Sequence, residues 1–353
     1  MLEATPAADV PPVPPPETSP EAPAGPPPGP SDLPSAAPAI GRVGPVTAGR
    51  LAPATSLRPP AVALDGTTAG DFHVAAASII GTGHLQSGQP RQDGYNVMVG
   101  NSGRLYVAIA DGLGSKPASQ LGAHLFSESV LIAAAHAEAG GDDEPPTASR
   151  LLAQADARMA QVVTDHYQLE AKSCSCVGAV AVFSADGCDI ARLGDVSAFT
   201  LADGAFDEAF PADSALVNVV SASMPGADEA DVETTRIGPE PVVVFGTDGL
   251  ANDLRNSGAL REWLAAQWRV PQLPFAIGDA LRYRRQGSHD DRTAVVVWRT
   301  ALPAVAFRPE AGRTDTGTEA GRTQKGKTET GRTETGKTGA GQAQSWEVPD
   351  APG

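Results

Sequence analysis

The sequence predicts an α+β fold, a layered sandwich of sheets and helices, and three observations support this prediction. Several short apolar runs have the length and composition of strands, and other segments have helical spacing. These elements follow one another as strands, two long helices, strands, a helical pair and a final strand. Helices grouped in this way indicate stacked layers rather than a regular alternation of strand and helix.

The first predicted elements are strands. Residues 73–80 are apolar and are followed by a polar loop that leads to Asp93. Residues 95–99 and 105–110 flank a Gly/Asn turn at residues 100–103 and predict a hairpin.

Two long helices and further strands follow. Residues 117–139 and 148–170 carry apolar side chains at helical spacing, and Pro117 suits a first helical turn. Residues 176–183 and 189–193 predict strands, and we expect residues 195–201 to continue the second of them.

The last part of the domain begins with an acidic, irregular stretch at residues 203–235, which we expect to be a surface insertion or flap. Residues 242–245 predict a buried strand and residues 293–298 the final strand. Between them, residues 260–268 and 275–285 predict a pair of helices.

Composition divides the chain into one domain and two terminal segments. Residues 1–70 are rich in Pro and Ala, residues 308–353 are rich in Thr and Gly with a five-residue repeat, and both predict disorder. Residues 71–307 remain as a single domain of about 235 residues, which is large enough for a hydrophobic core. We interpret the terminal segments as tethers or regulatory segments, and the tail threonines as accessible kinase targets.

Charge and cysteine content exclude several classes of function. The formal net charge is -16 and lies almost wholly in residues 71–307, which argues against nucleic-acid binding and suits a protein that concentrates cations. Three cysteines predict reduced thiols in a cytoplasmic setting. Neither a signal-peptide pattern nor an apolar run of membrane-spanning length is present, so we expect no membrane association.

Four aspartates occur where strand-like runs begin or end. Asp111 and Asp248 follow apolar runs, and Asp93 and Asp290 precede them. Converging carboxylates repel one another unless cations neutralise them, so a shared metal site is the simplest explanation. Oxygen donors without a zinc-type histidine pair favour Mg²⁺ or Mn²⁺.

Five segments in this order resemble the PP2C-type metal-dependent Ser/Thr phosphatases, and the bacterial branch most of all. The resemblance spans residues 72–300 and is carried by residues 88–93, 108–114, 193–198, 245–250 and 289–293. It implies an α-β-β-α sandwich of two mixed or antiparallel sheets flanked by helical pairs. It also implies a binuclear Mn²⁺ or Mg²⁺ centre held by Asp93, Asp111, the Gly112 carbonyl, Asp248 and Asp290, with a third ion left open.

The chain departs from the family pattern near the phosphate-binding position. The family commonly has an arginine about five residues before the first aspartate, where this chain has Gly88. We expect Arg91 or His84 to take over this role, and we leave open whether Asp291 contacts metal-bound water or shapes a turn. Asp195 is interpreted as structural.

The predicted function is hydrolysis of phosphoserine and phosphothreonine on proteins by a monomeric, cytoplasmic, bacterial-type signalling phosphatase. The implied partners are phosphorylated proteins and a Ser/Thr kinase. The alternative is a non-catalytic PP2C-fold module that binds phosphoproteins or regulates a partner, and a third interpretation is a scaffold that acts through its terminal segments.

Overall fold

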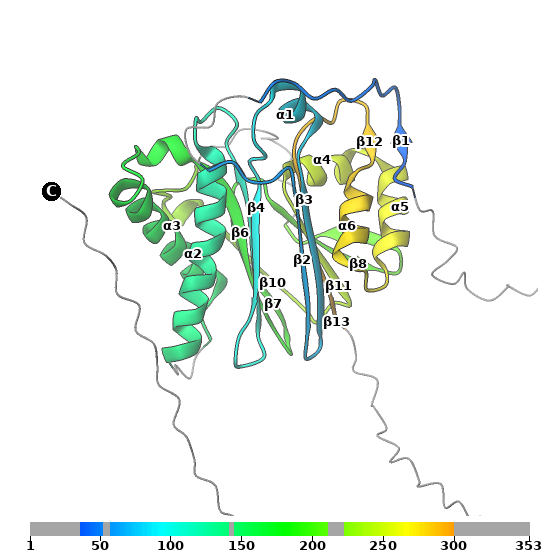
Figure 1. Ribbon diagram of the computed structural model, residues 1–353. Helices are drawn as coiled ribbons and strands as arrows, with labels where there is room; N and C mark the ends of the chain where they lie inside the picture. Colours follow the sequence, from blue (N-terminus) through cyan, green and yellow to red (C-terminus); the bar gives the residue numbers. More distant parts are fainter. Residues whose placement is uncertain (1–35, 52–56, 141–144, 211–221, 300–353) are drawn as a thin grey trace, which may run out of the picture. The chain divides into compact units, whose positions relative to one another are not determined.

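The computed structural model describes residues 36–51, 57–140, 145–210 and 222–299, which fold around two stacked antiparallel sheets (Figure 1). The first sheet has the strand order β10-β7-β6-β5-β4. Its strands are β4 (Gly94–Val99), β5 (Leu105–Gly112), β6 (Cys176–Ser184), β7 (Gly187–Leu193) and β10 (Glu233–Ile237).

The second sheet has the strand order β2-β3-β13-β11-β8-β9, and every neighbouring pair is antiparallel. Its strands are β2 (Val62–Ala69), β3 (Phe72–Ile79), β8 (Ser197–Ala202), β9 (Ala205–Glu208), β11 (Val242–Gly246) and β13 (Arg292–Arg299). A separate parallel pair joins β1 (Ala39–Ile40) to β12 (Arg284–Arg285).

Helices cover the outer face of each sheet, as Figure 1 shows. Helices α2 (Ser119–Gly140) and α3 (Ala148–Asp165) pack on the five-stranded sheet. Helices α4 (Asp248–Asn256), α5 (Gly258–Trp268) and α6 (Pro274–Leu281) pack on the six-stranded sheet. The short helix α1 (Thr82–Ser87) follows β3. The predicted α-β-β-α sandwich is therefore confirmed.

Central strands are apolar throughout because both of their faces are buried. In β5, Tyr106 and Ala108 face helices α2 and α3, whereas Leu105 and Val107 face the other sheet. This period of two is the geometry of an extended strand. Because both sets of alternate side chains are buried, the sequence of such a strand is a continuous apolar run rather than an alternation of apolar and polar residues.

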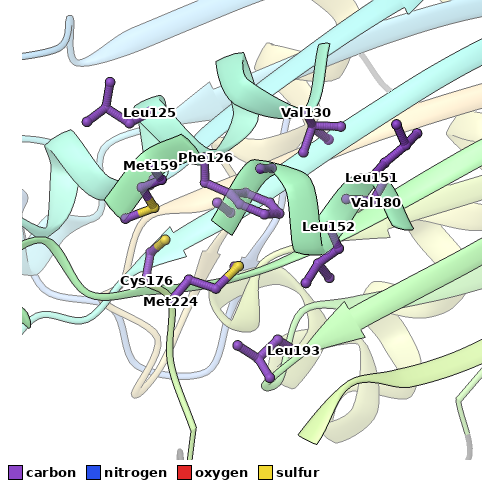
Figure 2. Packing of buried hydrophobic residues seen from close by; sticks show 14 of the residues in the cluster. Leu125, Phe126, Val130, Leu151, Leu152, Met159, Cys176, Val180, Leu193 and Met224 are labelled. Carbon is purple, nitrogen blue, oxygen red and sulfur yellow. The ribbon is translucent and has the colours of Figure 1, made fainter. Parts of the chain in front are cut away.

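The core under α2 and α3 is closely packed (Figure 2). Phe126 of α2 and Met159 of α3 are fully buried among Val180, Cys176 and Met224. Truncating a buried phenylalanine of this kind to alanine costs about 3–5 kcal/mol. The buried, free cysteines act here as small apolar side chains.

Three expectations from the sequence need correction near the strand ends. Residues 195–201 do not continue β7, because the chain crosses after Leu193 to the other sheet and forms β8. Helix α4 was not expected; it is short and carries a glycine in its first turn. The helix expected at 275–285 ends at Leu281, and the following arginines pair with β1.

The expected domain boundary at residue 71 also needs correction. Strand β2 pairs with β3 along its whole length, and residues 36–51 form β1 and contact α1. The domain therefore begins before residue 71. Most of the expected arm, residues 211–221 of the expected flap, and the tail at 308–353 lie outside the described residues. No helix in the part of the chain that the structure describes is long and apolar enough to span a membrane.

Candidate metal centre

Four aspartates from both halves of the sandwich meet at one end of the two sheets. Asp93 immediately precedes β4, and Asp111 lies near the end of β5 in the same sheet. Asp248 opens α4 directly after β11, and Asp290 lies two residues before β13. Antiparallel strands of two stacked sheets thus bring carboxylates that are far apart in sequence to one edge.

A cavity of about 640 Å³ lies at this edge. Four of the five residues expected to hold metal line this cavity: Asp111, Gly112, Asp248 and Asp290. Asp93 is not part of the lining, since it is 1% exposed and lies behind the wall. The other polar or titratable side chains of the wall are His84, Gln92, Asp195, Asn252, Asp253, Asn256, Arg285, Ser288 and His289.

Asp93 is held from the opposite sheet. Its Oδ2 atom accepts hydrogen bonds from the hydroxyls of Thr247, at 2.8 Å, and Thr293, at 2.6 Å. Thr247 precedes α4 and makes no side-chain cap for that helix, because its hydroxyl is committed to Asp93. Burial, and then the charge of Asp291, raise the pKa of Asp93 well above its usual range.

Asp111 and Asp248 are perturbed in the same direction. Burial raises the pKa of Asp111 well above its usual range, and the charges of Asp93, Asp248 and Asp290 raise it further. Burial and the charge of Asp290 raise the pKa of Asp248 to about 6. Without a compensating cation, each of these carboxylates therefore holds its proton to a higher pH than an ordinary aspartate does.

The residues present fit a divalent metal ion. Asp248 Oδ1 is buried and has no hydrogen-bond partner in the described structure. An unpaired buried carboxylate oxygen is costly, and a cation at this point would remove the cost. Carboxylate and carbonyl oxygens are also the donors that Mg²⁺ and Mn²⁺ prefer.

Two glycines allow the turns at the site to pack closely. A Cβ atom on Gly249 would lie 2.1 Å from the carbonyl oxygen of Asp291. A Cβ atom on Gly112 would lie 2.9 Å from the carbonyl oxygen of Gln92. Glycine is therefore required on steric grounds next to Asp111 and Asp248, whatever the site binds.

Asp291 fixes the loops around the site. Its Oδ1 accepts from the backbone of Gly81 and its Oδ2 from the backbone of Gln92, each at 2.6 Å. Oδ2 also lies 3.0 Å from His84 Nδ1. Both oxygens are committed and the side chain is 2% exposed, so its geometry favours the turn-shaping role over contact with metal-bound water.

His84 lies in the wall of the cavity and is held by this carboxylate. The ion pair with Asp291 raises the pKa of His84, against the lowering effect of burial. His84, Asp290 and Asp291 each offer one ligand atom, and these atoms lie within 4.8 Å of one another. The committed oxygens of Asp291 make this trio a weaker candidate for metal binding than the four aspartates.

Arg91 does not occupy the position expected of a phosphate ligand. Its side chain is 1% exposed and is absent from the cavity wall. Its Nε donates to the carbonyl of Pro60 at 3.0 Å, and its Nη1 donates to the Ser78 hydroxyl and to the Asp93 carbonyl. The expectation that Arg91 binds phosphate is therefore corrected: its geometry is that of a buried structural arginine.

Asp195 was interpreted as structural, but the structure places it in the cavity wall. It lies in the crossing between β7 and β8, and burial raises its pKa. The signal that could have found it is its position after an apolar strand, in the segment Leu193-Gly194-Asp195. That position is the same as those of Asp111 and Asp248.

The family profile for Protein phosphatase 2C matches residues 80–276. No curated protein matches the sequence. Among solved structures, the catalytic domain of the serine/threonine phosphatase PstP with two manganese ions is 19% identical, with a TM-score of 0.47, and the match covers 65% of this chain and 98% of that chain.

Two further solved structures are similar to the same extent. RsbX in complex with magnesium is 14% identical over 67% of this chain and 99% of that chain, with a TM-score of 0.45. PppA from Pseudomonas aeruginosa, described as a key regulatory component of T6SS, is 16% identical over 65% of this chain and 98% of that chain, with a TM-score of 0.46.

Proposed function

This chain belongs to the protein phosphatase 2C family, and on that premise we propose that it hydrolyses phosphoserine and phosphothreonine on proteins. The observation that carries the proposal is the unpaired, buried Asp248 Oδ1 in a cavity whose wall also holds Asp111 and Asp290, with Asp93 buried behind it. A pair of Mn²⁺ or Mg²⁺ ions bound there would neutralise phosphate charge and lower the pKa of a water nucleophile.

We assign the ligands to Asp93, Asp111, Asp248, Asp290 and the carbonyl of Gly112. The threonine hydroxyls on Asp93 Oδ2 orient that carboxylate and leave Oδ1 outside these two bonds. Holding a ligand by hydrogen bonds of this kind raises the precision of a metal site. The protein thus contributes a fixed set of oxygens rather than a nucleophile of its own.

His84 is the group we assign to proton donation. The leaving group of a phosphoserine or phosphothreonine is an alkoxide, which needs a proton as the bond to phosphorus breaks. Asp291 holds His84 Nδ1 at 3.0 Å, which leaves Nε2 as the ring atom that can deliver the proton. Its raised pKa increases the protonated fraction near neutral pH.

One observation favours a second candidate, a phosphoprotein-binding module without turnover. Arg91 is buried away from the cavity, and Arg285, the one arginine in the cavity wall, is ion-paired with Asp253 at 2.8 Å. Charge stabilisation of the transition state would then rest on the metal ions alone. We retain the enzyme as the main proposal because the carboxylates assigned to the metals are all present.

The proposed reaction implies the substrates and partners of the protein. The substrates would be phosphorylated proteins, and the pathway would include a Ser/Thr kinase. We propose a monomeric cytoplasmic protein, with the tail beyond residue 307 dispensable for turnover of a small ester. A truncation there should keep both its melting temperature and its activity.

The test is hydrolysis of para-nitrophenyl phosphate and of a phosphothreonine peptide by the full chain with Mn²⁺. We expect turnover that a chelator abolishes, and a loss of at least about 100-fold in Asp248→Asn and Asp111→Asn. Asp279→Asn, at an exposed carboxylate, is the control and should retain wild-type rates. Calorimetry would separate the two candidates: tight binding of Mn²⁺ and phosphopeptide without turnover would favour the module.

A further inference from the structure

A second cavity, of about 230 Å³, lies beside the metal cavity. The two cavities share part of one wall, formed by Arg285 at the end of β12 and by Gly287, Ser288 and His289 in the loop between β12 and β13. The second cavity therefore adjoins the metal cavity at these four residues.

The roof of the second cavity is formed by residues 42–47, which precede the family match at residues 80–276. This segment is fastened at both ends. On one side β1 pairs with β12, and the backbone of Arg42 donates to Gln286 Oε1 at 3.1 Å. On the other side the backbone of Gly49 donates to the carbonyl of Leu85 in α1 at 2.9 Å. Figure 1 shows this blue segment passing from β1 towards α1.

The lining of this second cavity is basic in a strongly acidic protein. It includes four arginines and no Asp or Glu, whereas the whole chain has a formal net charge of -16. The four are Arg42, Arg284, Arg285 and Arg292.

Only part of this positive charge is neutralised nearby. Arg285 and Arg292 share a single carboxylate, that of Asp253. Arg284 donates to the carbonyl of Gly44, which carries no net charge. No ion pair of the Arg42 side chain occurs within the described ranges, and this residue is exposed. The cavity therefore retains a local excess of positive charge.

We propose that this cavity is a subsite for an acidic or phosphorylated side chain that flanks the phosphorylated residue of a protein substrate. The inference rests on the proposed function, and it adds a preference for substrate sequence. The specificity would come from these arginines, all of which lie outside the family match.

The occupant is a side chain of the protein substrate itself, because the cavity lies beside the site where the phosphorylated residue of that substrate would bind. Consecutive residues of an extended peptide advance by about 3.3 Å, so residues one to three positions from the phosphorylated one reach roughly 3–10 Å. The shared wall places the second cavity next to the metal cavity, so a side chain one to three residues from the phosphorylated residue can enter it. Charge-assisted hydrogen bonds to arginine then distinguish an acidic neighbour from a neutral or basic one.

The experiment measures kcat/KM of the full chain on phosphothreonine peptides that carry Glu, Ala or Lys at each position from -3 to +3. We expect Glu at one or more positions to raise kcat/KM about tenfold over Ala, and Lys to lower it. This preference should weaken as salt is raised from about 0.05 M to 0.5 M, since exposed charges are screened.

The decisive variant is Arg42→Glu, and the matched control is Arg50→Glu. Both change the net charge equally within the same exposed segment, but Arg50 does not line the cavity. Arg42→Glu should remove or invert the preference for Glu while leaving turnover of para-nitrophenyl phosphate unchanged. Arg50→Glu should behave as wild type on every substrate. Equal kcat/KM for the Glu, Ala and Lys peptides, or equal effects of the two variants, would overturn the subsite.

A protein that hydrolyses none of these substrates would contradict the proposed function, and the subsite would then be tested by binding. Fluorescence anisotropy with the same labelled peptides and Mn²⁺ gives the affinities directly. Tighter binding of a Glu peptide that is lost in Arg42→Glu and kept in Arg50→Glu supports the subsite. Equal affinities across the peptide set reject it.

Discussion

The hydroxyl of Thr293 in β13 donates a 2.6 Å hydrogen bond to Asp93 Oδ2, and so joins the two sheets at the candidate metal centre. The Ser78 hydroxyl lies 2.6 Å from the same threonine oxygen and also accepts a hydrogen bond from Arg91. A chain of polar groups therefore runs from Arg91 to the carboxylate. Because every member is buried, each depends on its neighbours for its hydrogen bonds.

Thr293→Val removes this donor while keeping the shape of the side chain. We expect a loss of about 1–3 kcal/mol in the free energy of unfolding, because a buried carboxylate loses a hydrogen bond. The hydrogen bond from Thr293 lowers the pKa of Asp93, so its loss raises that pKa further and weakens Mn²⁺ binding. Urea unfolding and calorimetric Mn²⁺ titration measure the two effects. Thr293→Ser retains the hydroxyl and is the control; if both variants bind Mn²⁺ equally, the role assigned to the hydroxyl is wrong.

Arg91→Met tests whether this arginine holds the fold or the substrate. The side chain donates to Pro60, Ser78 and Asp93, so its removal leaves buried acceptors unpaired. We expect a loss of roughly 2–4 kcal/mol in the free energy of unfolding, with KM for a small ester changed less than about twofold. Arg269→Met, at an exposed position, is the control. A large rise in KM with an unchanged melting temperature would restore the phosphate-binding interpretation.

Most strands of the core were predictable because they are buried on both faces. Residues 242–245 and 293–298 are continuous apolar runs, and such runs have few alternatives in a soluble domain. Strand β2 escaped prediction because it is an edge strand whose partly exposed residues include Asp65, Gly66 and Thr67. The crossing after Leu193 escaped as well, since apolar residues before and after it fit either sheet.

The site was predictable to a lesser degree. The positions of Asp111 and Asp248 next to strand ends indicated a shared edge, and the structure brings them together. The direction in which a side chain points cannot be predicted from its neighbours in sequence. Arg91 is two residues from Asp93, yet it donates hydrogen bonds to Pro60 and Ser78, which are distant in sequence. The second cavity depends in part on residues 42–47, which composition assigned to a disordered arm.

Asp253→Asn tests how the loop that carries Asp290 is held. Asp253 Oδ2 accepts from the hydroxyls of Tyr283, at 2.8 Å, and Ser288, at 2.6 Å, and Oδ1 pairs with Arg285. Loss of this buried charge leaves Arg285 and Arg292 without their carboxylate partner, so we expect about 3–5 kcal/mol of destabilisation. We also expect weaker Mn²⁺ binding, because the loop before Asp290 loses its anchor.

The matched control for Asp253→Asn is Asp279→Asn, which removes an exposed ion pair with Arg282 and should cost less than about 0.5 kcal/mol. Urea unfolding and Mn²⁺ titration are run on both variants. If Asp253→Asn unfolds and binds Mn²⁺ like the control, then Asp253 does not position the loop.

The pH dependence of the metal-free protein follows from Asp248. Its pKa is raised to about 6 in the folded protein, against about 3.9 for an unperturbed aspartate. The folded state therefore binds the proton more tightly than the unfolded state. The resulting stability is fully present below about pH 3.9 and is lost as pH rises through about 6.

In EDTA, the free energy of unfolding of the wild type should fall between pH 5 and pH 7.5 by roughly 1.4 kcal/mol more than that of Asp248→Asn. Asp279→Asn should follow the wild type, because its exposed carboxylate is unrelated to the site. Mn²⁺ should bind more tightly as pH rises through about 6, since it then displaces fewer protons. Urea unfolding at each pH with and without Mn²⁺ measures both effects. Parallel pH profiles for the wild type and Asp248→Asn would show that the pKa of Asp248 is not raised in the folded, metal-free protein.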